Sequence, residues 1–234
     1  ELLVVIGIIA LLISILMPAL SRARISAQRV QCMSNHRQIM LGLIQYASDH
    51  RGKIPPPASY KKNPDGSTGA QDGCWYSMNW LGRYIGNTVD PSTYFTNSNS
   101  KIAVCSAMGM AQSNWDTLGI GMNACYDSGF LKGPKITQIK DAARTIIFVD
   151  VAKDATGYRA YYFEQFYRGD ASPRSWAGSG RVVAYRHGKQ TVVSFVDGHV
   201  ETFASQYEDW ESTQYNQGLH RALLNKEILY KVVN

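Results

Sequence analysis

The sequence predicts an α+β protein in which one long N-terminal helix packs on an antiparallel β-sheet. An uncharged apolar run from Leu2 to Leu20 opens the chain, and an amphipathic helical pattern follows it up to the prolines at 55–57. Short β-branched and aromatic segments then alternate with turn-rich stretches. We therefore expect three parts: a hydrophobic helix at 1–20, its amphipathic continuation at 21–52, and a globular β-rich domain at 53–234.

The apolar run is long enough to cross a bilayer, which takes about 20 apolar residues. It follows a carboxylate, Glu1, and ends in the basic stretch SRAR, whereas a cleaved signal peptide begins with a basic region and ends in small residues. Pro18 has no N–H and leaves the carbonyl of Ser14 without its helical partner, and Gly7 weakens the helix further. A carboxylate at the edge of hydrocarbon is costly without a positive partner nearby.

Beyond this run, apolar residues recur at helical spacing. The predicted stripe comprises Leu20, Ala23, Ala27, Val30, Met33, Met40, Ile44 and Ala47. No proline interrupts the pattern before Pro55, so we expect one helix of about 50 residues. Such a helix outgrows a single domain, and its first half must be buried by lipid or by other copies of the chain.

The globular part reads as turns and short strands. KKNPDGSTGAQDG (61–73) is predicted to be a loop, and helical pieces are expected after residue 207. The predicted strands are RTIIFVD (144–150), YRAYYFEQF (158–166), RVVAYRH (181–187), QTVVSFV (190–196) and HVETF (199–203). Asp197-Gly198 predicts a two-residue type I′ hairpin turn, which would place Val193 and Phe195 on one face with Val200.

Composition and charge restrict the function classes. A chain of 234 residues with 45% hydrophobic content can bury one core of ordinary size. The net charge is +6, but the 24 basic residues are spread along the chain without a block of five or six like charges. We expect no specific nucleic-acid partner.

Candidate chemical groups have structural alternatives. His187 and Asp197 could form a catalytic pair or bind a metal, and His199 could join them, but their spacing matches no recognised zinc motif. Asp197 already has a turn role, so a structural use of the pair is favoured. Asp65 and Asp72 lie in the predicted loop without the acidic pattern of an EF-hand.

Two glycine-containing motifs are rejected. GIGMNA at Gly119 lacks a preceding strand and a βαβ unit, and AGSGR around Ser179 lacks the spacing of a nucleophile elbow. The four cysteines contain no C-x-x-C pair, which argues against structural zinc and leaves disulfides or buried thiols. We therefore expect no catalytic residues, no metal and no cofactor.

Two segments resemble a known family. The stretch from ELLVVIGIIALLISILMPALSRAR to HRGKIPP is similar to the N-terminal region of type IV pilin-like and type II secretion pseudopilin-like proteins with a prepilin-type cleavage and methylation segment. RHGKQTVVSFVDGHVETF resembles the His-x9-Asp-Gly (H-X9-DG) signature of a subgroup, with His187, Asp197 and Gly198 at its ends. The match is specific at both ends of the chain and scattered between about 60 and 180.

The resemblance implies a mature chain incompletely represented at its start. It also implies a single-pass inner-membrane protein that later enters a cell-surface filament or periplasmic pseudopilus through pilus or secretion assembly machinery. In a homo-oligomeric helical filament, Glu1 would meet the free N-terminal amine of a neighbouring subunit, which offsets the cost of burying the carboxylate. Gly7 and Pro18 would mark where the helix can melt and lengthen on packing.

An exported domain folds outside the reducing cytoplasm, so at least one disulfide is expected. The pairs we favour are Cys32 with Cys105 and Cys74 with Cys125. The leading hypothesis is a non-enzymatic structural subunit of a type IV pilus-like or pseudopilus-like filament. The alternative is a minor pseudopilin or membrane-anchored periplasmic binding module that primes or caps a filament. A third class is an anchored hydrolase that uses His187 and Asp197.

Overall fold

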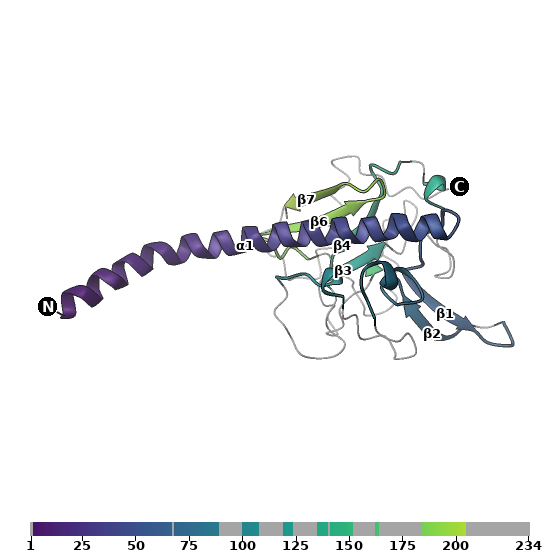
Figure 1. Cartoon of the computed structure of the whole chain (residues 1–234), viewed down its shortest axis with the longest axis horizontal. Coiled ribbons are helices and arrows are strands. Elements are labelled where there is room, and N and C mark those ends of the chain that lie inside the picture. The colour runs from purple at the N-terminus through teal and green to yellow at the C-terminus, as the bar shows by residue number, and fades with distance from the viewer. Residues whose placement is uncertain are drawn as a thin grey trace, which may run out of the picture.

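The computed structural model describes residues 2–66, 68–88, 100–107, 119–123, 135–139, 141–151, 162–163 and 184–204. One helix, α1 (Leu2–Asp49), runs along the molecule, and its second half lies against a β-sheet (Figure 1). The sheet has the order β5-β3-β4-β6-β7, and a separate hairpin, β1-β2, lies beside it. The predicted α+β class, with a long helix on an antiparallel sheet, is confirmed.

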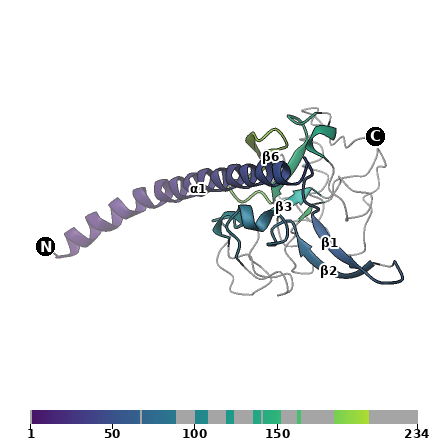
Figure 2. The same ribbon diagram turned by 45° about the vertical axis from the view of Figure 1, so that its right-hand side comes forward.

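The first part of α1 projects away from the rest of the described chain (Figures 1 and 2). Every large hydrophobic side chain from Leu2 to Leu20 is between 49% and 79% exposed. We call residues 2–20 the apolar arm. Its 19 residues span about 28 Å at the helical rise of 1.5 Å per residue, close to the roughly 30 Å hydrocarbon thickness of a bilayer.

The helix continues through Pro18 and ends where the sequence predicts, before the prolines. Gly52 N–H donates to the Ala47 carbonyl at 2.7 Å, and Arg51 adopts a left-handed φ of 56°. This six-to-one hydrogen bond with a left-handed residue before its donor is the Schellman arrangement of a helix C-terminus.

The buried face of α1 differs from the predicted stripe. Met40 and Ala47 are buried as expected, but Leu20, Val30 and Ile44 are 69%, 61% and 45% exposed. The residues of α1 that are buried are Cys32, Asn35, His36, Ile39, Met40, Gly42, Leu43, Tyr46 and Ala47. This face includes polar groups, which the prediction from apolar periodicity did not count.

Four strands of the sheet are antiparallel neighbours: β3 (Ile120–Asn123), β4 (Ile146–Asp150), β6 (Gln190–Phe195) and β7 (Val200–Ala204). β5 (Tyr162–Phe163) pairs in parallel with β3. All five residues of β4 are buried, which fits a central strand covered on both faces.

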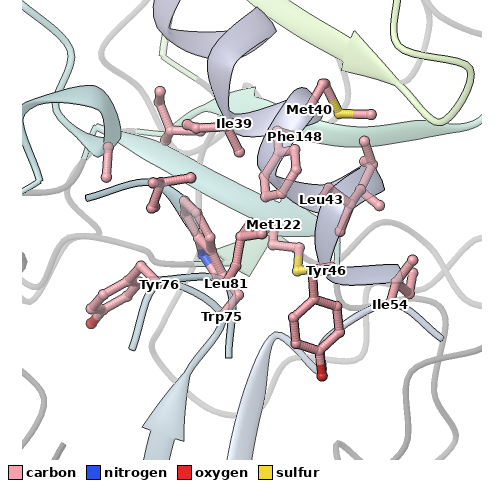
Figure 3. Close-up of a cluster of buried hydrophobic side chains, with 14 of the residues drawn as sticks. Ile39, Met40, Leu43, Tyr46, Ile54, Trp75, Tyr76, Leu81, Met122 and Phe148 are labelled. Carbon is pink, nitrogen blue, oxygen red and sulfur yellow. The ribbon is translucent and has the colours of Figure 1, made fainter. Parts of the chain in front are cut away.

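The core forms where α1 crosses the sheet (Figure 3). Ile39 and Leu43 of α1 lie in one buried cluster with Met122 of β3 and Phe148 of β4. The Trp75 ring packs against that of Phe148, with ring centroids 4.9 Å apart. These contacts fix the second half of α1 on the sheet and leave the apolar arm outside the core.

One loop prediction is wrong, and one predicted strand is absent from the described part of its segment. The segment 61–73 was predicted to be a loop, but it contributes to β1 (Ala58–Lys62) and β2 (Thr68–Cys74). The chain turns at residues 63–66 of this segment, where Gly66 N–H donates to the Asn63 carbonyl at 2.9 Å. In RVVAYRH, the described residues 184–187 form no strand. The helical pieces expected after residue 207 lie outside the described residues.

The β6–β7 hairpin has a different turn from the one predicted. Gly198 N–H donates to the Phe195 carbonyl at 2.9 Å, and Gly198 has φ 98° while Asp197 has no positive φ. The loop therefore has three residues and ends in a left-handed glycine, as in a type I turn with a G1 bulge. The extra residue shifts the register, so that Val200 pairs with Ser194 and lies on the face opposite Val193.

Candidate metal and thiol site

Four segments distant in the sequence meet beneath α1. Cys32 comes from α1, Cys105 from the chain just after the 3₁₀ helix η2 (Lys101–Ala103), Asp150 from the end of β4, and His187 from the turn before β6. One potential ligand atom from each residue lies within 4.8 Å of those of the other three. All four residues are buried. We call this set the Cys-Asp-His cluster.

One face of α1 carries both Cys32 of the cluster and His36, which contacts Asp150. Cys32 and His36 are four residues apart, so their side chains lie one above the other on α1. The Cys32 thiol donates to Asp150 Oδ1 at 3.2 Å, and His36 Nε2 lies 3.4 Å from the same oxygen. His36 Nδ1 is 2.6 Å from Ser194 Oγ of β6, which fixes the ring against the sheet.

Asp150 is the centre of the hydrogen bonding. Besides its Oδ1 contacts with α1, its Oδ2 accepts a hydrogen bond from Val192 N–H at 3.0 Å and lies 3.5 Å from His187 Nε2. Its side chain is completely buried. Burial opposes ionisation, but hydrogen bonds from His187 and His36 outweigh it and lower the pKa of Asp150. The carboxylate is therefore ionised inside the protein.

His187 is held by a tight turn. Gly188 and Lys189 both have φ 64°, as the central residues of a type I′ turn do, and His187 N–H donates to the Gln190 carbonyl at 3.1 Å. The ring is buried, with Nε2 3.3 Å from Cys105 Sγ. Its Nδ1 has no hydrogen-bond partner among the residues that the structure describes.

The two thiols are electrostatically different. The neighbouring Cys32 thiol, together with a hydrogen bond from His187, lowers the pKa of Cys105 to about 5 although burial opposes it. The neighbouring Cys105 sulfur and burial raise the pKa of Cys32, and the nearby Asp150 carboxylate adds to the effect. Burial lowers the pKa of His187, but its hydrogen bonds to Asp150 and Cys105 prevail and raise it to about 9. Cys105 is thus the more acidic of the two thiols, and it lies beside a histidine whose protonated form is favoured.

Such a donor set can do two things chemically. Two thiols, an imidazole and a carboxylate are a ligand set that zinc binds. The two sulfur atoms could instead form a disulfide if an oxidant is present. Both Cys32 and Cys105 are thiols in the structure. The predicted Cys32–Cys105 disulfide therefore stays a prediction, although its two sulfur atoms lie within 4.8 Å of each other.

The His-x9-Asp-Gly residues do not form one site. His187 enters the buried cluster, whereas Asp197 lies in the β6–β7 turn, where its Oδ1 is 2.6 Å from His199 Nδ1. That contact is partly exposed, with side chains 38% and 37% accessible. Gly198 supplies the left-handed turn conformation. The hydrolase hypothesis assumed a His187–Asp197 pair, but the partner of His187 is Asp150.

The other predicted residues are dispersed. Gly7 and Pro18 lie on the exposed apolar arm, and a Cβ placed on Gly7 would meet no atom within 4 Å. Cys74 is a buried thiol at the end of β2. Asp65 is exposed at the β1–β2 tip, and Asp72 is in β2. Three further predicted residues lie outside the described part of the chain: Glu1, Cys125 and Ser179.

Sequence reasoning missed Asp150 and His36. The signal for Asp150 was a carboxylate that ends the apolar run IIFV, where a buried charge requires a partner. The signal for His36 was its position one helical turn after Cys32. The expectation of no metal rested on the lack of local zinc spacing, and that test cannot detect ligands contributed by four separate segments.

Comparison with known proteins gives one partial match. A family model described as "Protein of unknown function (DUF1559)" matches residues 21–101, from the second part of α1 to η2. This family is associated with pilin-like, prepilin-type proteins. Neither the curated proteins nor the solved structures gave a significant match. The family match and the apolar helix are compatible with a pilin-like or membrane-anchored surface protein.

Proposed function

We propose that this protein is the structural subunit of a pilus-like or pseudopilus-like filament that assembles through its apolar arm. Before assembly the arm crosses the inner membrane, and in the filament it packs against the arms of other copies. The exposed apolar surface of residues 2–20 is the observation that carries the proposal. Contiguous apolar surface on this scale marks a membrane or protein contact.

The arm is unlike a core helix. α1 is the helix in the described chain that is long and apolar enough to cross a membrane, and none of its most apolar 18-residue window is buried. A core helix of similar hydropathy would be covered by its own domain. Because the arm and the sheet-bound half of α1 are one continuous helix, any contact that holds the arm also positions the globular part.

A lipid bilayer and a bundle of helices both require an apolar surface on the arm. Lipid and a bundle of apolar helices both remove the side chains from water, and the arm has nearly the length of a bilayer core. Removal from the membrane is then favourable only if other arms replace the lipid. The proposed pairing of Glu1 with the N-terminal amine of a neighbouring copy supplies register, because it compensates a charge that would otherwise be buried alone.

The test separates polymerisation from anchoring. The full chain is expressed with its native assembly machinery, the cells are sheared, and the sedimented material is examined by electron microscopy and mass spectrometry. Wild-type protein should be the main component of thin filaments. Glu1→Gln should reduce the filament yield at least tenfold while the protein remains in the membrane fraction. Glu201→Gln, a matched change at an exposed site on β7, should leave the yield unchanged.

A result without filaments would overturn the proposal. If wild-type protein stays in the membrane fraction and never forms the bulk of a polymer, the alternative is supported: a minor pseudopilin or membrane-anchored periplasmic module that primes or caps an assembly. If wild type and Glu1→Gln gave filaments in equal yield, the proposed polymerisation would stand, and the proposed pairing of Glu1 with the N-terminal amine would be rejected.

A further inference from the structure

We propose that Cys32, Cys105, Asp150 and His187 bind one Zn²⁺ ion in a closed structural site that fastens the arm-bearing helix to the sheet. The inference is independent of the proposed filament. It rests on the Cys-Asp-His cluster, whose ligand atoms already lie within 4.8 Å of one another.

The distances suit a tetrahedral ion. Zinc bonds of about 2.3 Å to sulfur and about 2.0–2.2 Å to nitrogen and oxygen place tetrahedral ligand atoms about 3.3–3.8 Å apart. In the structure, Cys32 Sγ is 3.2 Å from Asp150 Oδ1, and Cys105 Sγ is 3.3 Å from His187 Nε2. Asp150 Oδ2 is 3.5 Å from the same nitrogen. These three distances are close to the tetrahedral range, and the four potential ligand atoms all lie within 4.8 Å of one another.

The ligand types select the metal. Two thiolates and an imidazole suit borderline-soft Zn²⁺, whereas Ca²⁺ and Mg²⁺ prefer sites made of oxygen ligands. Four protein ligands fill a tetrahedron and leave no open position for water, which is typical of structural sites. All four residues are buried, so solvent does not compete for the ion.

The surroundings complete the site. His36 lies 3.4 Å from Asp150 Oδ1, and Val192 N–H donates to Oδ2, so the carboxylate is oriented by neighbours outside the four ligands. Two thiolates and a carboxylate around Zn²⁺ leave one net negative charge. A positive charge lies near the site, because Arg186 precedes His187 in the chain and its guanidinium donates to the Gly119 and Val151 carbonyls.

A disulfide is the competing use of the same sulfur atoms. Its formation joins Cys32 Sγ to Cys105 Sγ, releases two protons and passes two electrons to an oxidant, so neither sulfur can then act as a thiolate ligand. A disulfide accounts for the proximity of the two sulfur atoms. It does not explain why the buried Asp150–His187 pair, with Oδ2 and Nε2 3.5 Å apart, faces the same point as the two sulfur atoms.

Zinc at this point would join four distant segments. It would connect α1 to β4, to the turn before β6 and to the chain after η2, at Cys32, where the buried part of α1 begins. Because the ligands are assembled only in the folded chain, binding energy would act as folding energy.

The experiment uses the full chain in detergent, reduced, stripped with a chelator and then titrated with Zn²⁺ or Co²⁺. Mass spectrometry should find one zinc per chain, and Co²⁺ should give thiolate charge-transfer absorption with the intense visible bands of a tetrahedral site. Cys105→Ser and Asp150→Asn should lower the Zn²⁺ affinity at least a hundredfold. Cys74→Ser and His199→Ala serve as controls outside the cluster and should retain full binding.

Circular dichroism monitors the folding of every variant. If a variant fails to fold, the zinc content of the wild-type protein still tests whether the site binds zinc. Well under one zinc per reduced, folded wild-type chain would overturn the proposal. A Cys32–Cys105 disulfide found by non-reducing peptide mapping of zinc-free protein from its native compartment would also overturn it. Equal loss of binding in the His199→Ala control would assign the ion to a surface site and reject the cluster.

Discussion

A charge placed in the apolar arm tests whether the arm leaves water. Leu11 lies at the middle of residues 2–20, and its side chain is 62% exposed. Leu41 lies on the same helix alongside the sheet and is 66% exposed. The substitutions Leu11→Asp and Leu41→Asp therefore make the same chemical change at similar exposure, and any loss of helix propensity is common to both.

The magnitude follows from the position of Leu11 in a span. Asp at the centre of a membrane helix costs about 2.5–3.5 kcal/mol, and the Leu that it replaces contributes about −0.3 to −0.6 kcal/mol. The difference of about 3–4 kcal/mol corresponds to a partition constant about 10²–10³ times smaller, since 1.4 kcal/mol is tenfold. At Leu41 the new carboxylate meets water, and the change should stay within about 0.5 kcal/mol.

The assay is flotation with vesicles of phosphatidylethanolamine and phosphatidylglycerol after dilution of the full chain from detergent. Wild type and Leu41→Asp should float with the vesicles, whereas most Leu11→Asp should remain at the bottom of the gradient. Equal partitioning of the two variants would refute the assignment of residues 2–20 as the membrane-contacting surface. Circular dichroism of each variant confirms that the globular part is folded.

Three further predictions concern the globular part. Phe148→Ala should destabilise the protein by about 3–5 kcal/mol, because it removes a fully buried ring that packs against Trp75. Denaturant unfolding followed by tryptophan fluorescence measures the loss, and a loss below about 1 kcal/mol would contradict the packing in Figure 3. Gly198→Ala should cost about 1–2 kcal/mol because φ is 98° there, and an unchanged midpoint would reject the left-handed turn. His36→Gln should weaken Zn²⁺ binding about 10–100-fold in a chelator competition, since His36 orients Asp150, and unaltered affinity would remove it from the support of the site.

Local sequence patterns predicted the backbone elements well where neighbouring residues decide them. The uninterrupted helical residues and the prolines after Lys53 fixed the length of α1, and β-branched runs located β4, β6 and β7. The segment 61–73 was harder because turn-forming residues also occur within its paired strands. Strand pairing there depends on a partner strand as well as on composition.

The candidate site could be predicted only in fragments. His187 was singled out, yet it was associated with Asp197 because the two are close in the sequence. The structure pairs it with Asp150 instead, and the hairpin turn places Asp197 beside His199. The proximity of Cys32 and Cys105 was expected from the resemblance and an oxidising compartment, but no sequence spacing indicated that a carboxylate and an imidazole join them.

The sequence alone therefore determined that a long helix precedes an antiparallel sheet, and that residues 2–20 of this helix carry no charge. These properties depend on periodicity and side-chain polarity within a few residues. Tertiary structure decided which face of α1 is buried, on which face Val200 lies, and that Cys32, Cys105, Asp150 and His187 meet. Those outcomes depend on how distant segments cross and on one extra residue in a turn, and local sequence patterns carry no record of either.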